Sequence, residues 1–277
     1  MTATTYRLSQ PDLGWRYRFM LAIQDIMLGI AATEIWWILA WQDIKQRYRR
    51  SMIGPFWFTI STGVMVGGIS LVYATLFNQP LGDYLIFVAL GMIGWMFISM
   101  VATEACTVFS ESDRLITQVN IPLTTHVMRM VMRNLIILAH NALLLVPILM
   151  WYGIPNLIDA LSIIFVPIVF AINGLWLSLA LGGICTRFRD VTQIVTNGIQ
   201  MIFFVTPIMW KPELMANRAW IVDYNPFAHY IAILRDPLLG KGIPLFSWSV
   251  VLTITLIGCI ACTFALTRYR QRLAYWL

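Results

Sequence analysis

The stretch YLIFVALGMIGWMFISMVAT, residues 84–103, contains no charged side chain. A helix of about 20 predominantly apolar residues crosses the hydrocarbon core of a bilayer, which is about 30 Å thick. Similar apolar runs recur along the chain, which is 59% hydrophobic and 12% charged, whereas soluble domains carry roughly 25% charged residues. This composition supplies too little polar surface for a soluble fold of 277 residues. The sequence therefore predicts a multi-pass membrane protein.

Six apolar runs predict six transmembrane helices. We expect them at about residues 55–77, 84–103, 135–152, 161–185, 194–210 and 248–267. Each must be helical within lipid, because every backbone polar group needs an internal partner there. The predicted fold is all-α and integral to the membrane. It has an N-terminal cytoplasmic segment at residues 1–54 and a six-span domain at residues 55–277.

The distribution of positive charge predicts the orientation of these spans. Of the 19 Lys and Arg residues, 15 precede the first span, follow the last, or lie in the second-to-third and fourth-to-fifth connections. The other four, Lys211, Arg218, Arg235 and Lys241, lie in the last loop on the opposite side. Cytoplasmic loops carry the excess of Lys and Arg. We therefore expect both termini in the cytoplasm.

An amphipathic helix is predicted before the first span. One helical face carries residues spaced by four, three and four positions, namely Trp37, Trp41, Ile44 and Tyr48. The remaining surface is polar, with Gln42, Asp43, Gln46, Arg49 and Arg50. This pattern indicates a helix at the membrane interface with its aromatic rings at headgroup depth. A generic juxtamembrane anchor is the alternative. The short apolar stretch at residues 19–32 is also expected on the membrane surface.

Two connections are too long and too polar for simple turns. Residues 110–134 are broken by Pro122, and we expect a short helix before that proline. Residues 211–247 contain several prolines around a short apolar piece at residues 230–234. That piece is too short to span and predicts re-entrant half-helices, which need surrounding protein or a cavity at membrane depth.

The sequence lacks the usual motifs of an enzyme. It contains no GxxxxGK[ST] loop for ATP, no HExxH, no GxSxG and no metal-ligand cluster, since the one CxxC, Cys259 and Cys262, lies mid-span with no second pair and is interpreted as packing. We therefore expect no catalytic residue, no metal and no cofactor in this chain. Carboxylates inside the spans are nearly absent, with Glu104 the one candidate. A proton- or ion-coupled carrier usually needs such groups, so we expect energy to come from another protein.

Several strings together are similar to a known family. They are DIKQRY at residues 43–48, SMIGPFW at 51–57, RFRDV at 187–191, NPF at 225–227 with Arg235, and YRQRLAYWL at 269–277. In this order they resemble the permease subunits of ABC-type exporters of polysaccharide and O-antigen (lipopolysaccharide). The resemblance runs from about residue 35 to the C-terminus. It is weaker at TQVNIPL, residues 117–123, where the family often carries more positive charge.

This resemblance implies a transport subunit without its own ATPase site. It implies a homodimer in the inner membrane, paired with two copies of a separate ABC ATPase that binds ATP and Mg²⁺, and a lipid-linked polysaccharide as substrate. Nucleic acid is not an expected partner. Residues implied to couple to the ATPase are Asp113, Arg114, Leu115, Ile116, Arg187, Arg189 and Asp190. The interface helix implied to meet the lipid carrier includes Trp37, Trp41, Ile44, Lys45, Arg47 and Tyr48. The re-entrant region is represented by Asn225, Pro226, Phe227 and Arg235.

Other functions fit parts of the same pattern. An ABC-type permease for capsule, teichoic acid or a small molecule would share most of these features. A polytopic membrane enzyme acting on lipid-linked sugars would need a carboxylate pair or a His cluster on one membrane face, and the sequence shows none. A secondary transporter is disfavoured by the scarcity of acids within the spans.

Overall fold

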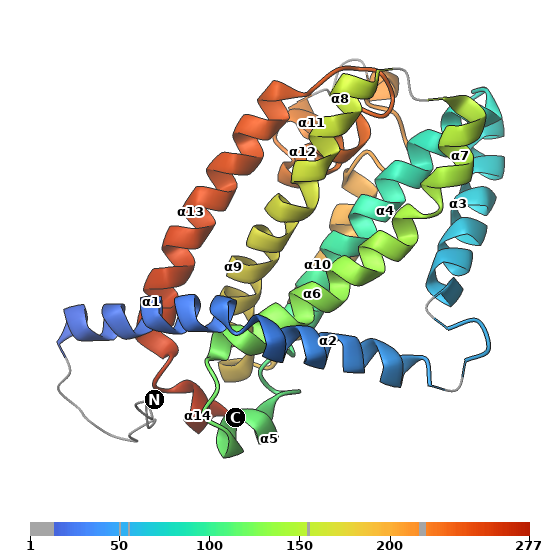
Figure 1. The fold of residues 1–277 in the computed structure, drawn as a ribbon. Helices are drawn as coiled ribbons and strands as arrows, with labels where there is room; N and C mark the ends of the chain where they lie inside the picture. Colours follow the sequence, from blue (N-terminus) through green and yellow to red (C-terminus); the bar gives the residue numbers. More distant parts are fainter. Residues whose placement is uncertain (1–13, 50, 55, 154–155, 216–219) are drawn as a thin grey trace.

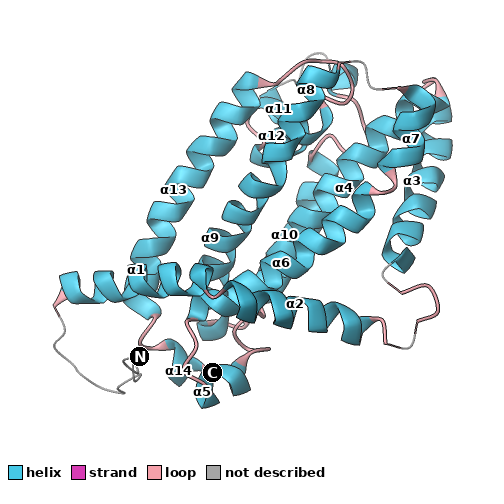
Figure 2. Cartoon of the chain, in the orientation of Figure 1, coloured by secondary structure: helices cyan, strands magenta, loops and turns pink. Residues whose placement is uncertain are grey.

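The computed structural model describes residues 14–49, 51–54, 56–153, 156–215 and 220–277, and these residues form helices and loops without a strand (Figure 2). Pro55, at the predicted start of the first span, and three cations used for the orientation, Arg7, Arg50 and Arg218, lie outside the described residues. The helices are α1 (Trp15–Ala31), α2 (Thr33–Arg47), α3 (Phe56–Leu76), α4 (Leu81–Ala105), α5 (Asp113–Gln118), α6 (Leu123–Ala142), α7 (Leu145–Tyr152), α8 (Leu157–Leu161), α9 (Val166–Arg187), α10 (Asp190–Val205), α11 (Trp220–Asp223), α12 (Pro226–Arg235), α13 (Leu245–Tyr269) and α14 (Leu273–Trp276).

Five segments of the described chain are long and apolar enough to cross a membrane. They cover residues 56–76, 81–105, 123–151, 157–187 and 245–269. They correspond to the first, second, third, fourth and sixth predicted spans, and they form the long bundle in Figure 1. The third, predicted at residues 135–152, begins at Leu123, because α6 continues through the second half of the predicted connection. The prediction of an all-α integral membrane protein is confirmed.

The fifth predicted span is shorter than the others. Its helix, α10, begins at Asp190 and ends at Val205, whereas the sequence indicated residues 194–210. Its 16 residues rise about 24 Å, less than the hydrocarbon core. The helix ends just before Thr206-Pro207, because a proline disfavours helical geometry in the residue that precedes it. α10 packs against α4 and α9, so it belongs to the bundle.

Helix α4 is the centre of the bundle. Within its most apolar stretch 72% of the residues are buried, against 22–28% in the other four long segments. It contacts α3, α6, α9, α10 and α12. Two glycines permit the closest approaches, because a Cβ at Gly91 would lie 3.3 Å from the Ile208 carbonyl oxygen and one at Gly94 would lie 3.2 Å from Leu234. The outer faces of the remaining spans are apolar and exposed, as expected for helices that face lipid.

Helices α1 and α2 run across one end of the bundle (Figure 1). A bend of 62° separates them at Ala32. Together they are long enough to span by length and composition, and their predicted place on the membrane surface stays a prediction. α1 packs on α6 and α13, and α2 packs on α6.

Candidate functional site

The two predicted ATPase-coupling segments lie at the same end of the molecule. α5 and the α9–α10 turn are both at the end that α1, α2 and α14 cover (Figure 1). The short helix predicted before Pro122 is present as α5, which starts at Asp113. Arg114 is exposed, while Ile116 packs against the buried cluster around Phe109. The side of α5 that carries Ile116 is therefore packed on the bundle, and the side that carries Arg114 is accessible.

The α9–α10 turn presents charged side chains. Arg187, Arg189 and Asp190 are all exposed. The guanidinium of Arg187 lies 5.3 Å from the centre of the Trp276 ring, so the C-terminal helix α14 contacts this turn. Asp190 begins α10, where a negative charge is favourable beside the positive end of the helix dipole. Two exposed segments on one end suit a docking surface, and their role in coupling stays a prediction.

The interface helix α2 is rotated relative to the predicted face. Trp37 and Trp41 are exposed, as expected for rings that meet the membrane surface, and Tyr48 is half-buried. Ile44 instead packs inward, 3% exposed. Asp43, which the sequence pattern put on the polar outer face, also points inward to α6. The reason is electrostatic, since α6 carries two arginines that pair with this carboxylate.

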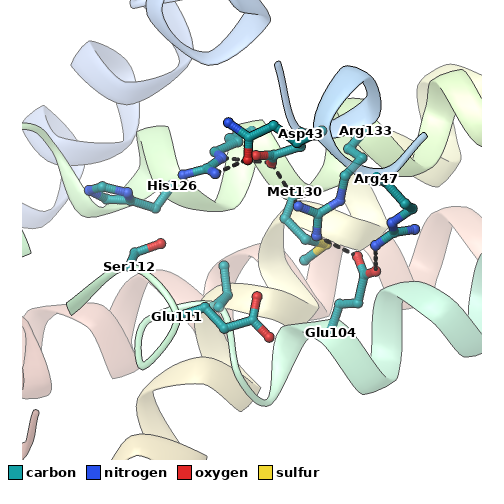
Figure 3. Close-up of a pocket in the computed structure, with 11 residues that line it drawn as sticks. Asp43, Arg47, Glu104, Glu111, Ser112, His126, Met130 and Arg133 are labelled. Carbon is teal, nitrogen blue, oxygen red and sulfur yellow. Dashed lines mark hydrogen bonds and ion pairs between the residues drawn. The ribbon is translucent and has the colours of Figure 1, made fainter. Parts of the chain in front are cut away.

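A charge cluster joins α2 to α4 and α6, and consists of Asp43, Arg47, Glu104, Arg129 and Arg133. The Asp43 carboxylate accepts hydrogen bonds of 2.7 Å from Arg129 Nε and from Arg133 Nη1. Glu104 accepts at 2.8 Å from Arg133 Nη2 and pairs with Arg47 Nη2 at 3.4 Å. Figure 3 shows Arg133 between the two carboxylates. Arg133 thus links α2 to the C-terminal end of α4.

This cluster lines a polar cavity of about 360 Å³ that also includes Glu111, Ser112 and His126. Burial alone would raise the pKa of Asp43, but hydrogen bonds and positive charge from Arg129 and Arg133 outweigh burial and hold this pKa below its usual value. The carboxylate is therefore charged at neutral pH. Within the described residues, no three His, Cys, Asp or Glu side chains are placed to hold a metal ion.

Lys45 and Arg47, which the resemblance assigns to the lipid carrier, have different environments. Arg47 pairs with Glu104 and faces the cavity. Lys45 is exposed, and its ammonium lies 5.9 Å from the centre of the Trp41 ring. Of the two cations, Lys45 is the one on the outer side of the helix with the exposed tryptophans.

The predicted re-entrant residues lie at the opposite end of the bundle, in and beside α12. Asn225 caps this helix by accepting a hydrogen bond from the Phe227 N–H, and its amide donates to Thr206. Arg235 is 4% exposed and donates to the Pro207 carbonyl at 2.7 Å, with its guanidinium over the ring of Phe87. α12 is packed against α4 and α13, and Asn225 and Arg235 both bond to the loop that follows α10. Whether α12 enters the membrane stays a prediction.

Asp25 lies in the apolar stretch at residues 19–32, and the sequence pattern does not assign it a role. It is 2% exposed and accepts hydrogen bonds from the backbone N–H of Leu123 and Thr124. Through these hydrogen bonds Asp25 of α1 caps the start of α6. Its carboxylate also pairs with Arg270 Nε at 3.0 Å, which links α1 to the C-terminal segment. One helical turn later, Gly29 lets α1 approach the start of α6 closely, since a Cβ at this position would collide with Thr124.

Comparison with known proteins gives a consistent set of similarities. A family described as ABC-2 type transporter matches residues 34–239. A protein from Klebsiella pneumoniae, called O-antigen export system permease protein RfbA, is 24% identical over 197 residues, covering 70% of this chain and 76% of the relative. A protein of the same description from Myxococcus xanthus is 24% identical over 229 residues, covering 79% of this chain and 86% of the relative.

Proposed function

The chain belongs to the ABC-2 type transporter family, and from this premise we propose that it is the permease subunit of an ATP-driven exporter of lipid-linked polysaccharide of the O-antigen class. The similarity to relatives called O-antigen export system permeases, over most of both chains, supports this substrate class. The protein is a multi-pass membrane protein with several apolar helices. We place it in the inner membrane with both termini in the cytoplasm, on the strength of the Lys and Arg distribution.

The observation that carries the proposal is a polar stripe on the exposed face of α10. Gln193, Asn197 and Gln200 follow a spacing of four and three residues and are all exposed. Phe204, also exposed, continues the same line. Carboxamides facing hydrocarbon would lack hydrogen-bond partners, at a cost of several kcal/mol per group. This face therefore suits a water-filled path or a second copy of the chain.

The same stripe has the chemistry of a glycan path. Carboxamides donate to and accept from sugar hydroxyls, and an aromatic ring packs on the apolar C–H face of a sugar. Gln193 donates a hydrogen bond of 2.9 Å to Asn197, and both side chains are exposed. In our proposal two copies of the chain place their α10 helices on either side of the glycan.

Energy enters through a partner protein. The sequence has no phosphate-binding loop, so ATP and Mg²⁺ are bound by two copies of a separate ABC ATPase. This partner docks on α5 and on the α9–α10 turn. Both segments are exposed and lie on the end that the cation distribution assigns to the cytoplasm. Lys45 on α2 contributes to attraction of the anionic lipid carrier at the inner leaflet.

The test is export from cells whose own copy of the protein has been removed. Surface glycan, detected with an antibody on intact cells, should disappear and accumulate inside, and should return with the wild-type chain. Gln193→Leu combined with Asn197→Leu should insert normally and fail to restore it, whereas Ile194→Val, one residue along the helix, should restore it. Normal surface glycan without the protein, or export of teichoic acid or capsule instead, would refute the assigned substrate.

A further inference from the structure

A second cavity, of about 220 Å³, lies between α4, α9, α12 and α13 within the bundle. It is separate from the charge cluster and from the stripe on α10. Most of the side chains that line it are aromatic or aliphatic, among them Phe97, Val101, Phe170, Leu177 and Ile254. Phe97, Val101 and Phe170 are each at most 5% exposed, so the deepest walls of the cavity lie inside the bundle, while Leu177 and Ile254 are only partly buried.

The polar atoms in the cavity wall are bonded to protein partners. The Asn173 side-chain oxygen accepts from Tyr230 at 2.6 Å and from Trp176 Nε1 at 2.8 Å. Its amide nitrogen donates to the Val169 carbonyl and to Thr255. These bonds direct the polar atoms toward one another and leave ring faces and methyl groups for an occupant.

We infer that this cavity binds the terminal part of one fatty acyl chain of a membrane phospholipid. Water would need two to four polar partners, and a sugar would need several, which the satisfied wall does not supply. An apolar cavity of about 150 Å³ is already large enough to bind benzene. The cavity lies against residues 97–101 of α4, residues 170–177 of α9 and Ile254 of α13, all within segments apolar enough to cross a bilayer, whose core consists of alkyl chains.

The favourable free energy of binding the acyl chain comes from dispersion contacts with the cavity wall. Lipid tails are as apolar as leucine, so transfer from bilayer to cavity brings little hydrophobic energy. An empty cavity, however, deprives its wall of dispersion contacts, and an alkyl chain restores them. The bound chain would complete the packing between α12 and the spans, since Phe227 and Tyr230 of α12 form one side of the cavity. This inference is independent of which substrate the protein exports.

Photolabelling tests the inference on the full chain reconstituted in phosphatidylglycerol nanodiscs. The probe is phosphatidylglycerol with a diazirine at the end of one acyl chain. Labelling of exposed lipid-facing residues is expected in any case and serves as the internal control. We expect additional adducts on the buried Val101 and Phe170, mapped by mass spectrometry of peptides.

Two substitutions should remove only the internal adducts. Ile254→Trp fills the cavity from α13, and Leu177→Phe narrows it from α9, in case the larger change impairs folding. The matched control is Ile257→Trp, on the same helix at a position that is 61% exposed. It should leave the internal adducts unchanged.

Three results would overturn the inference. The first is an absence of adducts on Val101 and Phe170 in the wild-type protein. The second is equal internal labelling of wild-type and Ile254→Trp proteins. The third is displacement of the probe by a polyprenyl phosphate but not by unlabelled phosphatidylglycerol, which would assign the cavity to an isoprenoid chain.

Discussion

Replacement of Asp43 by Asn should loosen helix α2 from the bundle without changing its shape. The carboxylate, in a side chain 12% exposed, neutralises Arg129 and Arg133, whose side chains are 23% and 11% exposed. Asn is nearly isosteric and can accept hydrogen bonds, but it carries no charge. In the variant, the partly buried guanidiniums of Arg129 and Arg133 therefore lose the negative charge that they share. Arg133 keeps one carboxylate partner, Glu104.

The size of the effect follows from the degree of burial. Removing one partner of a fully buried pair costs about 3–5 kcal/mol, whereas a surface pair contributes about 0–1 kcal/mol. The exposure of Arg129 places this site between those limits, and we expect a loss of about 2–3 kcal/mol. A free-energy difference of that size raises the frequency with which α2 detaches by about 30- to 150-fold.

Hydrogen exchange of the chain in nanodiscs measures this opening. Backbone amides of α2 should exchange about 30- to 150-fold faster in Asp43→Asn, while amides in the buried part of α4 should keep their protection. Glu34→Gln is the control, because Glu34 lies on the same helix, is exposed and forms no ion pair among the described residues. Exchange that rises less than about threefold, or equally in both variants, would refute a role of the charge cluster in holding α2.

The pH dependence of α2 attachment has a defined sign. The pKa of Asp43 is lowered, so its stabilising charge is fully present above the ordinary Asp pKa, about 3.9. It is lost only as pH falls through the lower folded-state pKa. Protection of α2 should thus be constant from about pH 5 to 8 and should fall only below about pH 4.

Further predictions concern orientation and coupling. A reporter fused to the C-terminus should be active only when it is of the kind that works in the cytoplasm; activity of a periplasmic reporter would contradict the orientation. Arg189→Glu and Asp190→Lys, each at an exposed position, should reduce export and ATPase stimulation while membrane insertion stays normal. The reason is that charge reversal places like charges opposite one another at the docking surface. Wild-type export by both variants would exclude the α9–α10 turn as a docking site for the ATPase. Lys45→Gln should raise the half-maximal concentration of lipid-linked glycan for ATPase stimulation by about fivefold, since one juxtamembrane cation contributes about 1 kcal/mol.

The spans are predictable from sequence because lipid imposes a local requirement. A helix that crosses the hydrocarbon core is predominantly apolar whether it faces lipid or other helices, so α3, α4 and α13 are each visible in the sequence alone. The predicted end of the fifth span, residue 210, lies five residues beyond the end of α10 at Val205. Residues 206–210 are apolar enough that hydropathy alone extends the span through them. Backbone geometry at Thr206-Pro207 ends the helix there, and hydropathy does not register that constraint.

The inward face of α2 depends on residues far away in the chain. Spacing alone groups Trp37, Trp41, Ile44 and Tyr48, and this grouping is correct for the exposed tryptophans. Asp43 turns inward because Arg129 and Arg133, 86 and 90 residues later, occupy the surface of α6 beneath it. A partner at that distance leaves no periodic signal in α2 itself, so spacing cannot predict the pairing.

Asp25 differs, because its local sequence does contain a usable signal. A carboxylate in an apolar surface helix is costly unless something compensates its charge, and Gly29 lies one turn later on the same face. A small residue beside an acid on one face indicates close contact with a group that donates hydrogen bonds. The start of a helix is such a group, since its first N–H groups lack internal partners. Pro122, which marks the start of α6, was visible in the sequence, and α6 has no side-chain cap of its own. The geometry of Asp25 thus follows from combining two local observations that hydropathy treats separately: an acid out of place in α1 and an uncapped helix start in α6.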